Sequence, residues 1–284
     1  MMRNLDATAH PDDDDEHGAA RGSGPFPLPP GARLEPDLPY GDDDRQRLDV
    51  YHPREATSAP LVLMVHGGGW SRGDKAHWRV VRNKVWHWVS KGCIFVSTNH
   101  RLAPAADPLA QAEDIAMALA FVQSRLRAWG GDAARLVVMG HSAGAHLAAL
   151  LTADPVITVR HGAAPWLATV MLDSAAMDVE RIMRAPHPPL YDLAFGDDPD
   201  YWRKSSPLQR LASTPVAPML VICSSRRPGA NLQARALAAR AAQFGGRVEV
   251  LPVDLSHAEI NETLGLRNGY TERVDAFLET VGVD

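Results

Sequence analysis

The sequence has 284 residues, of which 45% are hydrophobic and 22% charged, and its formal net charge is -5. That length suits one large domain, and the composition is ordinary for a globular chain. No apolar run is long enough to cross a bilayer, and the slight acidity provides no basic surface for a nucleic acid. We therefore expect neither a membrane nor a nucleic acid as a partner.

The N-terminal segment differs in composition from the rest. Residues 1–36 are expected to be disordered or extended, because their acidic and Pro-rich sequence buries too little apolar surface to offset the entropy of ordering. Residues 37–284 are expected to form the folded domain. The segment has no apolar core of a signal peptide, and Cys93 and Cys223 lie in apolar runs typical of reduced, buried cysteines. These features predict a cytoplasmic protein.

Strands and helices alternate along the remaining chain. Continuous apolar runs predict buried strands, and apolar residues at helical spacing predict the helices between them. The predicted strands are Arg47–Tyr51, Leu61–Val65, Cys93–Ser97, Arg135–Met139, Leu167–Leu172, Met219–Cys223 and Arg247–Val253. The predicted helices are His77–Ser90, Pro108–Trp129, Ser142–Thr152, Leu232–Phe244 and Thr271–Val281. This order predicts an α/β fold with a mostly parallel, doubly wound sheet and helices on both faces.

A long connection separates the strands that end at Leu172 and begin at Met219. Its length exceeds that of a plain crossover, so we expect a small cap-like insertion at about residues 177–211. Its aromatic side chains either line an apolar pocket for an acyl or aryl group or pack in the core, and the sequence leaves both open. They are Tyr191, Phe195, Tyr201 and Trp202.

One motif predicts a nucleophilic serine. Gly140-His141-Ser142-Ala143-Gly144 fits G-x-S-x-G and stands between the predicted strand Arg135–Met139 and a predicted helix. In that context a tight turn excludes side chains at both glycines and exposes the serine Oγ on a strained backbone. Alone, the pattern also fits an ordinary glycine-rich turn. Ser142 is the candidate nucleophile.

A second glycine motif strengthens that interpretation. His66-Gly67-Gly68-Gly69-Trp70 follows the predicted strand Leu61–Val65 directly. Attack by a serine on an ester carbonyl develops negative charge on oxygen, which backbone N–H groups can stabilise if they approach closely. We expect the N–H groups of Gly68, Gly69 and Ala143 to form this oxyanion hole, the last at a helix N-terminus whose dipole favours an anion.

His257 is the candidate general base. In serine hydrolases built on a doubly wound sheet, the usual order along the chain is serine, acid, histidine. Only His257 comes just after the last predicted strand, Arg247–Val253. The three other histidines that follow Ser142 lie one helical turn beyond it or in irregular stretches: His146, His161 and His187.

The acid is less clearly indicated. It usually sits in the loop after the strand Met219–Cys223, but residues 224–231 contain no carboxylate, and the arginines at 226 and 227 are expected to be solvated. Asp173 closes the preceding strand and is our prediction. Asp254, three residues before the histidine, and Asp178 are the alternatives. Each also suits a turn or a helix cap, the commonest role of Asp at a strand end.

Together these motifs resemble the hormone-sensitive-lipase-like and feruloyl-esterase-like (BD-FAE-like) branches of the α/β-hydrolases. The likeness covers roughly Leu38 to the C-terminus, and the pieces keep their order along the chain. His100 departs from the lipase-like pattern, which usually has Tyr there. The matching pieces are Tyr40-Gly41, Leu48-Asp49-Val50-Tyr51, the glycine motif at 66–70, Asn99-His100-Arg101-Leu102-Ala103-Pro104, Glu113-Asp114 and the serine motif.

The resemblance implies an α/β-hydrolase fold with the cap-like insertion after the sixth strand. It implies a serine carboxylesterase that hydrolyses small short-chain acyl or aryl esters through an acyl-enzyme, with a small-molecule ester as partner. The branch also contains enzymes that resemble kynurenine formamidases, so a formamide or amide is the alternative substrate. No cofactor is implied, and no metal-ligand spacing occurs. A non-catalytic ligand-binding protein on the same scaffold and a homodimer are left open.

Overall fold

The structure, a computed structural model, describes residues 26–283. Residues 1–25, which make up most of the segment expected to be disordered or extended, lie outside the described residues. In the rest of that segment, Phe26 and Leu28 pack against the core, and the edge strand β1 (Arg33–Pro39) begins there and continues past residue 36. The sheet therefore begins with residues that belong to the Pro-rich stretch.

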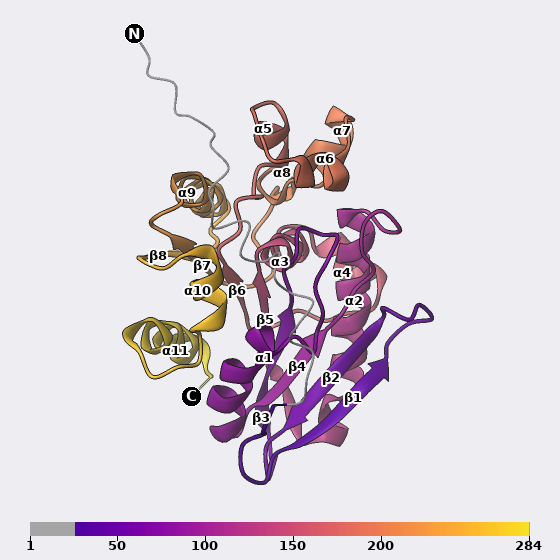
Figure 1. The fold of residues 1–284 in the computed structure, drawn as a ribbon, viewed down its shortest axis with the longest axis vertical. Helices are drawn as coiled ribbons and strands as arrows, with labels where there is room; N and C mark the ends of the chain where they lie inside the picture. The colour runs from indigo at the N-terminus through magenta and orange to yellow at the C-terminus, as the bar shows by residue number, and fades with distance from the viewer. Residues whose placement is uncertain (1–25, 284) are drawn as a thin grey trace.

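Within residues 26–283, eight strands form one sheet in the order β1-β2-β4-β3-β5-β6-β7-β8 (Figure 1). β2 pairs antiparallel with both β1 and β4, whereas all other neighbours are parallel. The strands after β1 are β2 (Arg47–His52), β3 (Ala59–Val65), β4 (Ile94–Thr98), β5 (Gly131–His141), β6 (Ala168–Leu172), β7 (Met219–Ser224) and β8 (Val248–Val253). The predicted mostly parallel sheet is confirmed.

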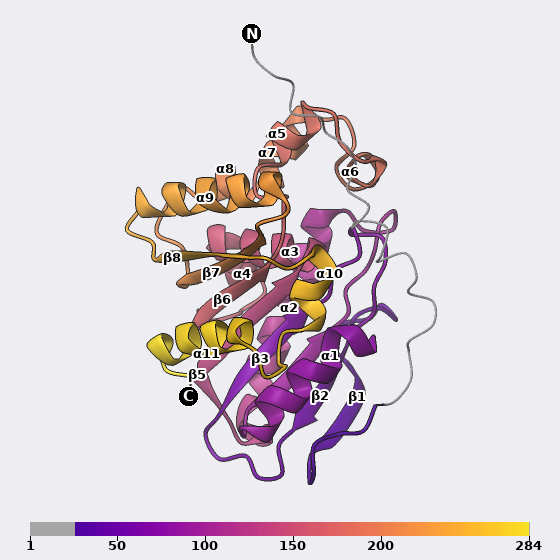
Figure 2. The ribbon, with the colours of Figure 1, turned by 60° about the vertical axis from the view of Figure 1, so that its left-hand side comes forward.

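Helices cover both faces of the sheet, as predicted (Figures 1 and 2). One face is covered by α1 (Trp78–Lys84), which continues into a π-helical turn (Val85–Val89), and by α10 (His257–Glu262) and α11 (Gly269–Val281). The other face is covered by α2 (Pro108–Arg125), which ends in a 3-10 turn (Leu126–Trp129), and by α3 (Ala143–Ala153), α4 (Pro155–Arg160) and α9 (Pro228–Ala242). No helix among the described residues is long and apolar enough to span a bilayer.

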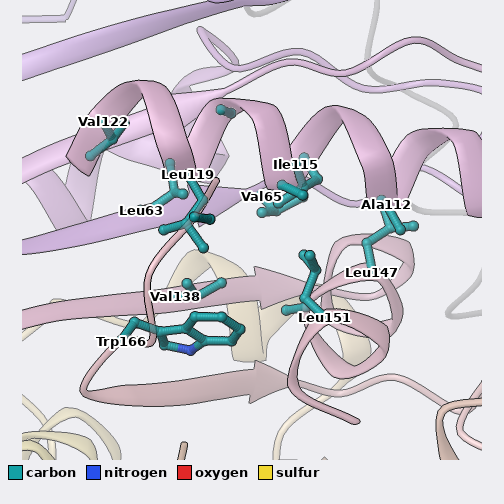
Figure 3. Close-up of a cluster of buried hydrophobic side chains, with 14 of the residues drawn as sticks. Leu63, Val65, Ala112, Ile115, Leu119, Val122, Val138, Leu147, Leu151 and Trp166 are labelled. Atoms are coloured by element: carbon teal, nitrogen blue, oxygen red, sulfur yellow. The ribbon is translucent and has the colours of Figure 1, made fainter. Parts of the chain in front are cut away.

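Strand β3 shows why its sequence is apolar without interruption. Leu61, Leu63 and Val65 point into the core beneath α2 and α3, whereas Val62 and Met64 point into the core beneath α1 and α11. Since successive side chains of a strand face opposite sides, a strand covered on both faces must be apolar at every position. Figure 3 shows the first of these cores, where side chains of α2 and α3 meet those of β3 and β5.

Four short helices fill the connection between β6 and β7. They are α5 (Val179–Met183), α6 (Pro189–Phe195), α7 (Pro199–Lys204) and α8 (Pro207–Arg210). Three of them begin with a proline at the first helical position, where its fixed φ and missing N–H fit the start of a helix. The four gather at one end of the molecule, in the stretch where the sequence predicts a cap-like insertion (Figures 1 and 2).

Candidate active site

Ser142 lies at a sharp turn between β5 and α3. Its backbone has φ 53° and ψ -117°, an uncommon conformation for a residue with a side chain. A Cβ at Gly140 would lie 2.3 Å from the Gly144 carbonyl oxygen, and a Cβ at Gly144 would lie 2.4 Å from the Val65 carbonyl oxygen. Both glycines of the motif are therefore required by the close approach of backbone to backbone, and the expected elbow geometry is present.

The glycine loop after β3 lies against this elbow. A Cβ on Gly67 would come within 3.0 Å of the Ser142 Cβ. Gly68 and Gly69 have φ of 116° and 56°, which only glycine adopts at low cost. Gly69 and Ala143 line the same cleft as Ser142, whereas Gly68 lines a second cavity that adjoins the loop. The structure thus brings the loop, the serine and the first residue of α3 together.

The imidazole of His257 reaches the serine. Its Nε2 lies 3.0 Å from the Ser142 Oγ, and its Nδ1 lies 2.7 Å from the Asp173 Oδ2. His257 is the first residue of α10, which begins with a capping box in which Ser256 and Glu259 bond each other's backbone N–H groups. The histidine therefore stands at a fixed helix terminus rather than in a loop.

The three candidate acids lie in different surroundings. Asp173 is completely buried, and its Oδ1 accepts a hydrogen bond from the Ser224 N–H at 2.8 Å. The Asp254 side chain is 83% exposed and pairs with Arg226 on the surface. Asp178 caps α5 by accepting a hydrogen bond from the Arg181 N–H. Only Asp173 of the three bonds the His257 ring.

An arginine joins this cluster. The Arg227 Nη1 lies 2.5 Å from the Asp173 Oδ2 and 2.8 Å from the His257 Nδ1. Burial alone would raise the pKa of Asp173, but the His257 hydrogen bond and the Arg227 charge outweigh it and hold that pKa below its ordinary value. The expectation that both loop arginines are solvated is wrong for Arg227, whose side chain is only 14% exposed. It holds for Arg226, which is 47% exposed.

The other histidines have different roles in the structure. His146 is buried in α3, where its Nδ1 accepts the Trp70 indole N–H at 3.1 Å and its Nε2 donates to the Ser205 carbonyl at 2.8 Å. It thereby ties the glycine loop to α3 and to the segment after α7. His161 pairs with Glu113, and His187 pairs with Asp192.

The cleft at Ser142 is bordered by the glycine loop, by the first residue of α3 and by α6 of the insertion. Leu190 and Tyr191 of α6 line it together with Trp70. The other three aromatic residues of the insertion do not line the cleft. Phe195 stacks edge-on against Trp70 and is buried, the Tyr201 hydroxyl accepts the Leu109 N–H, and the Trp202 indole donates to the Gly196 carbonyl.

Two features of the site are not predicted from the sequence. Helix α10 was not expected, although Ser256 and Glu259 have the S-x-x-E spacing that marks a helix start. The approach of Arg227 to Asp173 had no local signal, because it depends on which strands are neighbours in the sheet.

Comparison with known proteins agrees with this geometry. The sequence model of the BD-FAE family matches residues 48–158, which include both glycine motifs. Esterase LipQ of Mycobacterium tuberculosis is 30% identical over an alignment of 264 positions, which covers 84% of this chain and 62% of that protein. A probable isoprenylcysteine alpha-carbonyl methylesterase of Arabidopsis thaliana, ICMEL1, is 34% identical over 119 residues. This match spans 42% of the chain and only 24% of the plant protein.

Solved structures with the same fold include esterases. Esterase B of Lactobacillus rhamnosis superposes with a TM-score of 0.73 at 20% identity, over 95% of this chain and 90% of that one. Esterase 2 of Thermogutta terrifontis superposes with a TM-score of 0.68 at 20% identity, over 89% of this chain and 94% of that one. The chain therefore has the α/β-hydrolase fold of these structures, and its residues 48–158 match the sequence model of the BD-FAE family.

Proposed function

We propose that this chain is a serine carboxylesterase that hydrolyses small acyl or aryl esters through an acyl-enzyme. The observation that carries the proposal is the chain of hydrogen bonds from the Ser142 Oγ through both His257 nitrogens to the Asp173 carboxylate, with distances of 3.0 and 2.7 Å. A nucleophile within reach of a base, which a third group orients, is the arrangement that nucleophilic catalysis requires.

In the first half of the reaction, the His257 Nε2 removes the Ser142 hydroxyl proton as Oγ attacks the ester carbonyl. The proton then passes to the departing alkoxide, and the acyl group stays on Oγ. In the second half, the same nitrogen removes a proton from water as its oxygen attacks the acyl-enzyme, and it then returns the proton to the departing Ser142 Oγ as the acid is released. Asp173 keeps the proton on Nδ1 and offsets the positive charge of the imidazolium.

The tetrahedral oxyanion would be bound by backbone amides. Gly69 and Ala143 line the cleft beside the serine, and the positive end of the α3 dipole lies at Ala143. Gly68 belongs to the same loop, and we assign its N–H to the oxyanion hole as well. The cytoplasmic location and the oligomeric state, a homodimer included, stay predictions from the sequence.

Ester substrates are favoured over amides because the mycobacterial relative that spans most of the chain is an esterase. A kynurenine formamidase of Danio rerio is also similar, with 28% identity over 148 residues, so a formamide is the second candidate substrate. Relative kcat/KM values for p-nitrophenyl butyrate and N-formylkynurenine separate the two.

The decisive experiment compares the wild type with Ser142→Ala on p-nitrophenyl butyrate. Loss of a triad nucleophile is expected to lower kcat by about a millionfold. A fluorophosphonate probe should label the wild type and leave the variant unlabelled. Near-normal turnover by the variant would refute the proposal, and a wild type that neither turns over esters nor reacts with the probe would indicate a non-catalytic ligand-binding protein.

A further inference from the structure

Arg227 follows β7, in the loop where the sequence resemblance leads one to look for the acid. Its Nη1 donates to the Asp173 Oδ2 at 2.5 Å and lies 3.3 Å from the Asp173 carbonyl oxygen. The same atom lies 2.8 Å from the His257 Nδ1. A guanidinium thus stands within hydrogen-bond distance of both groups that orient the proposed base.

The Oδ2 atom of Asp173 is the shared acceptor of this cluster. A guanidinium nitrogen always carries protons and never accepts, so Nη1 and a protonated Nδ1 can both bond the carboxylate but not each other. Two tautomers of His257 compete here. With Nδ1–H bonded to Asp173, Nε2 is free to accept the Ser142 proton; with Nε2–H, the bare Nδ1 would accept from Arg227, and the base would be lost.

The charge of Asp173 decides between these tautomers. A bare Nδ1 would place its lone pair 2.7 Å from a carboxylate oxygen, which is repulsive, whereas Nδ1–H there makes a charge-assisted bond. That preference lasts only while the carboxylate is ionised, and Asp173 is 0% exposed. A buried carboxylate without a cation nearby tends to take up a proton.

We propose that Arg227 is a positioning residue that keeps Asp173 ionised and so holds His257 in the tautomer able to accept the Ser142 proton. The inference rests on the proposed serine esterase function and adds a member to its machinery. It has an unusual consequence. The guanidinium assists catalysis only through the carboxylate, and without Asp173 it donates to Nδ1 and stabilises the inactive tautomer.

The sign of the Arg227 effect should therefore depend on Asp173. In the wild-type background, Arg227→Met should lower kcat for p-nitrophenyl butyrate by about 10- to 100-fold, the range typical of groups that orient a functional imidazole. In the Asp173→Gly background, whose own loss should be about ten-thousandfold, Arg227→Met should raise kcat by about tenfold, because a cation beside the imidazole is removed. Glycine is chosen at 173 because φ there is 50°.

The neighbouring arginine provides a matched control. Arg226 stands in the same loop but pairs with Asp254 and Glu259 on the surface, so Arg226→Met should change kcat less than twofold in either background. The pH profile gives a second readout. Loss of the cation raises the pKa of Asp173, and a protonated Asp173 no longer favours Nδ1–H, so the ratio of kcat of Arg227→Met to that of the wild type should fall as pH is lowered, whereas that of Arg226→Met should stay constant.

Thermal unfolding of each variant confirms that it is folded at the assay temperature. The inference is overturned if Arg227→Met lowers kcat by the same factor with and without Asp173, or if it behaves like Arg226→Met. Those outcomes leave the esterase function intact provided that Ser142→Ala is inactive. An active Ser142→Ala would instead remove the function on which the inference depends.

Discussion

The link between Trp70, His146 and Ser205 predicts a specific loss of stability in acid. The indole N–H is only a donor, so the His146 Nδ1 that accepts it must be unprotonated, and the buried ring is neutral. Burial lowers the pKa of His146 to about 4, partly opposed by its bond to the Ser205 carbonyl. In the unfolded chain the same ring titrates near the ordinary value of about 6.5.

The sign follows from proton binding by the two states. Above about pH 6.5 neither state binds the proton, and the full contribution to stability is present. As pH falls from there toward 4, His146 is protonated in the unfolded state but not in the folded state, so the free energy of unfolding decreases. The difference in pKa corresponds to about 2–3 kcal/mol by pH 4.5.

His146→Gln isolates this contribution. Glutamine offers one acceptor and one donor but does not titrate, so other acid-sensitive groups affect both proteins alike. The free energy of unfolding, measured in urea between pH 8 and 4.5, should fall about 2–3 kcal/mol further in the wild type than in the variant. Parallel curves within about 0.5 kcal/mol would show that His146 is not held neutral, and the reasoning would fail.

Two further substitutions test the packing around the site. Gly144→Ala would place a Cβ 2.4 Å from the Val65 carbonyl oxygen and 2.5 Å from that of His66. It should therefore lower the free energy of unfolding in urea by about 1–3 kcal/mol and lower ester turnover at least tenfold. The control is Gly229→Ala, whose Cβ would meet nothing within 4 Å and which should change neither quantity. Ile115→Ala shortens a fully buried side chain of α2 and should lower the free energy of unfolding by about 2–5 kcal/mol. Val159→Ala, at a position 69% exposed, should change it by less than about 0.5 kcal/mol. A stable, active Gly144→Ala or an unaffected Ile115→Ala would contradict the packing described.

The fold could be predicted from the sequence because its signals are local. The run at residues 61–65 is apolar at every position since helices cover both faces of β3. The glycine spacing around Ser142 predicts the elbow because, at each of the two glycines, neighbouring backbone lies too close for a Cβ. Strand β1 was harder to foresee, since an edge strand needs no apolar run and tolerates Pro36 and Pro39.

The acid and its arginine could not be fixed in this way. Aspartates at strand ends are common, and no local sequence pattern indicates which strands are neighbours in the sheet. In the structure, Leu172 of β6 pairs with Ile222 of β7, and the Asp173 N–H donates to the Ile222 carbonyl. Asp173 therefore lies beside the last residues of β7, where its Oδ1 accepts the Ser224 N–H, and the loop that follows β7 begins next to it.

In this chain the end of β6 carries the carboxylate, and the loop after β7 carries an arginine instead. An acid at the end of β6 is buried, where its charge is unfavourable unless a cation compensates it. The loop after β7 contains no carboxylate, and its Arg227 donates to the Asp173 oxygen that also bonds the His257 ring. A second carboxylate there would instead have repelled Asp173 and favoured its protonation. A loop without carboxylates after β7 is thus compatible with a buried, ionised Asp173 at the end of β6, because its arginine compensates that charge.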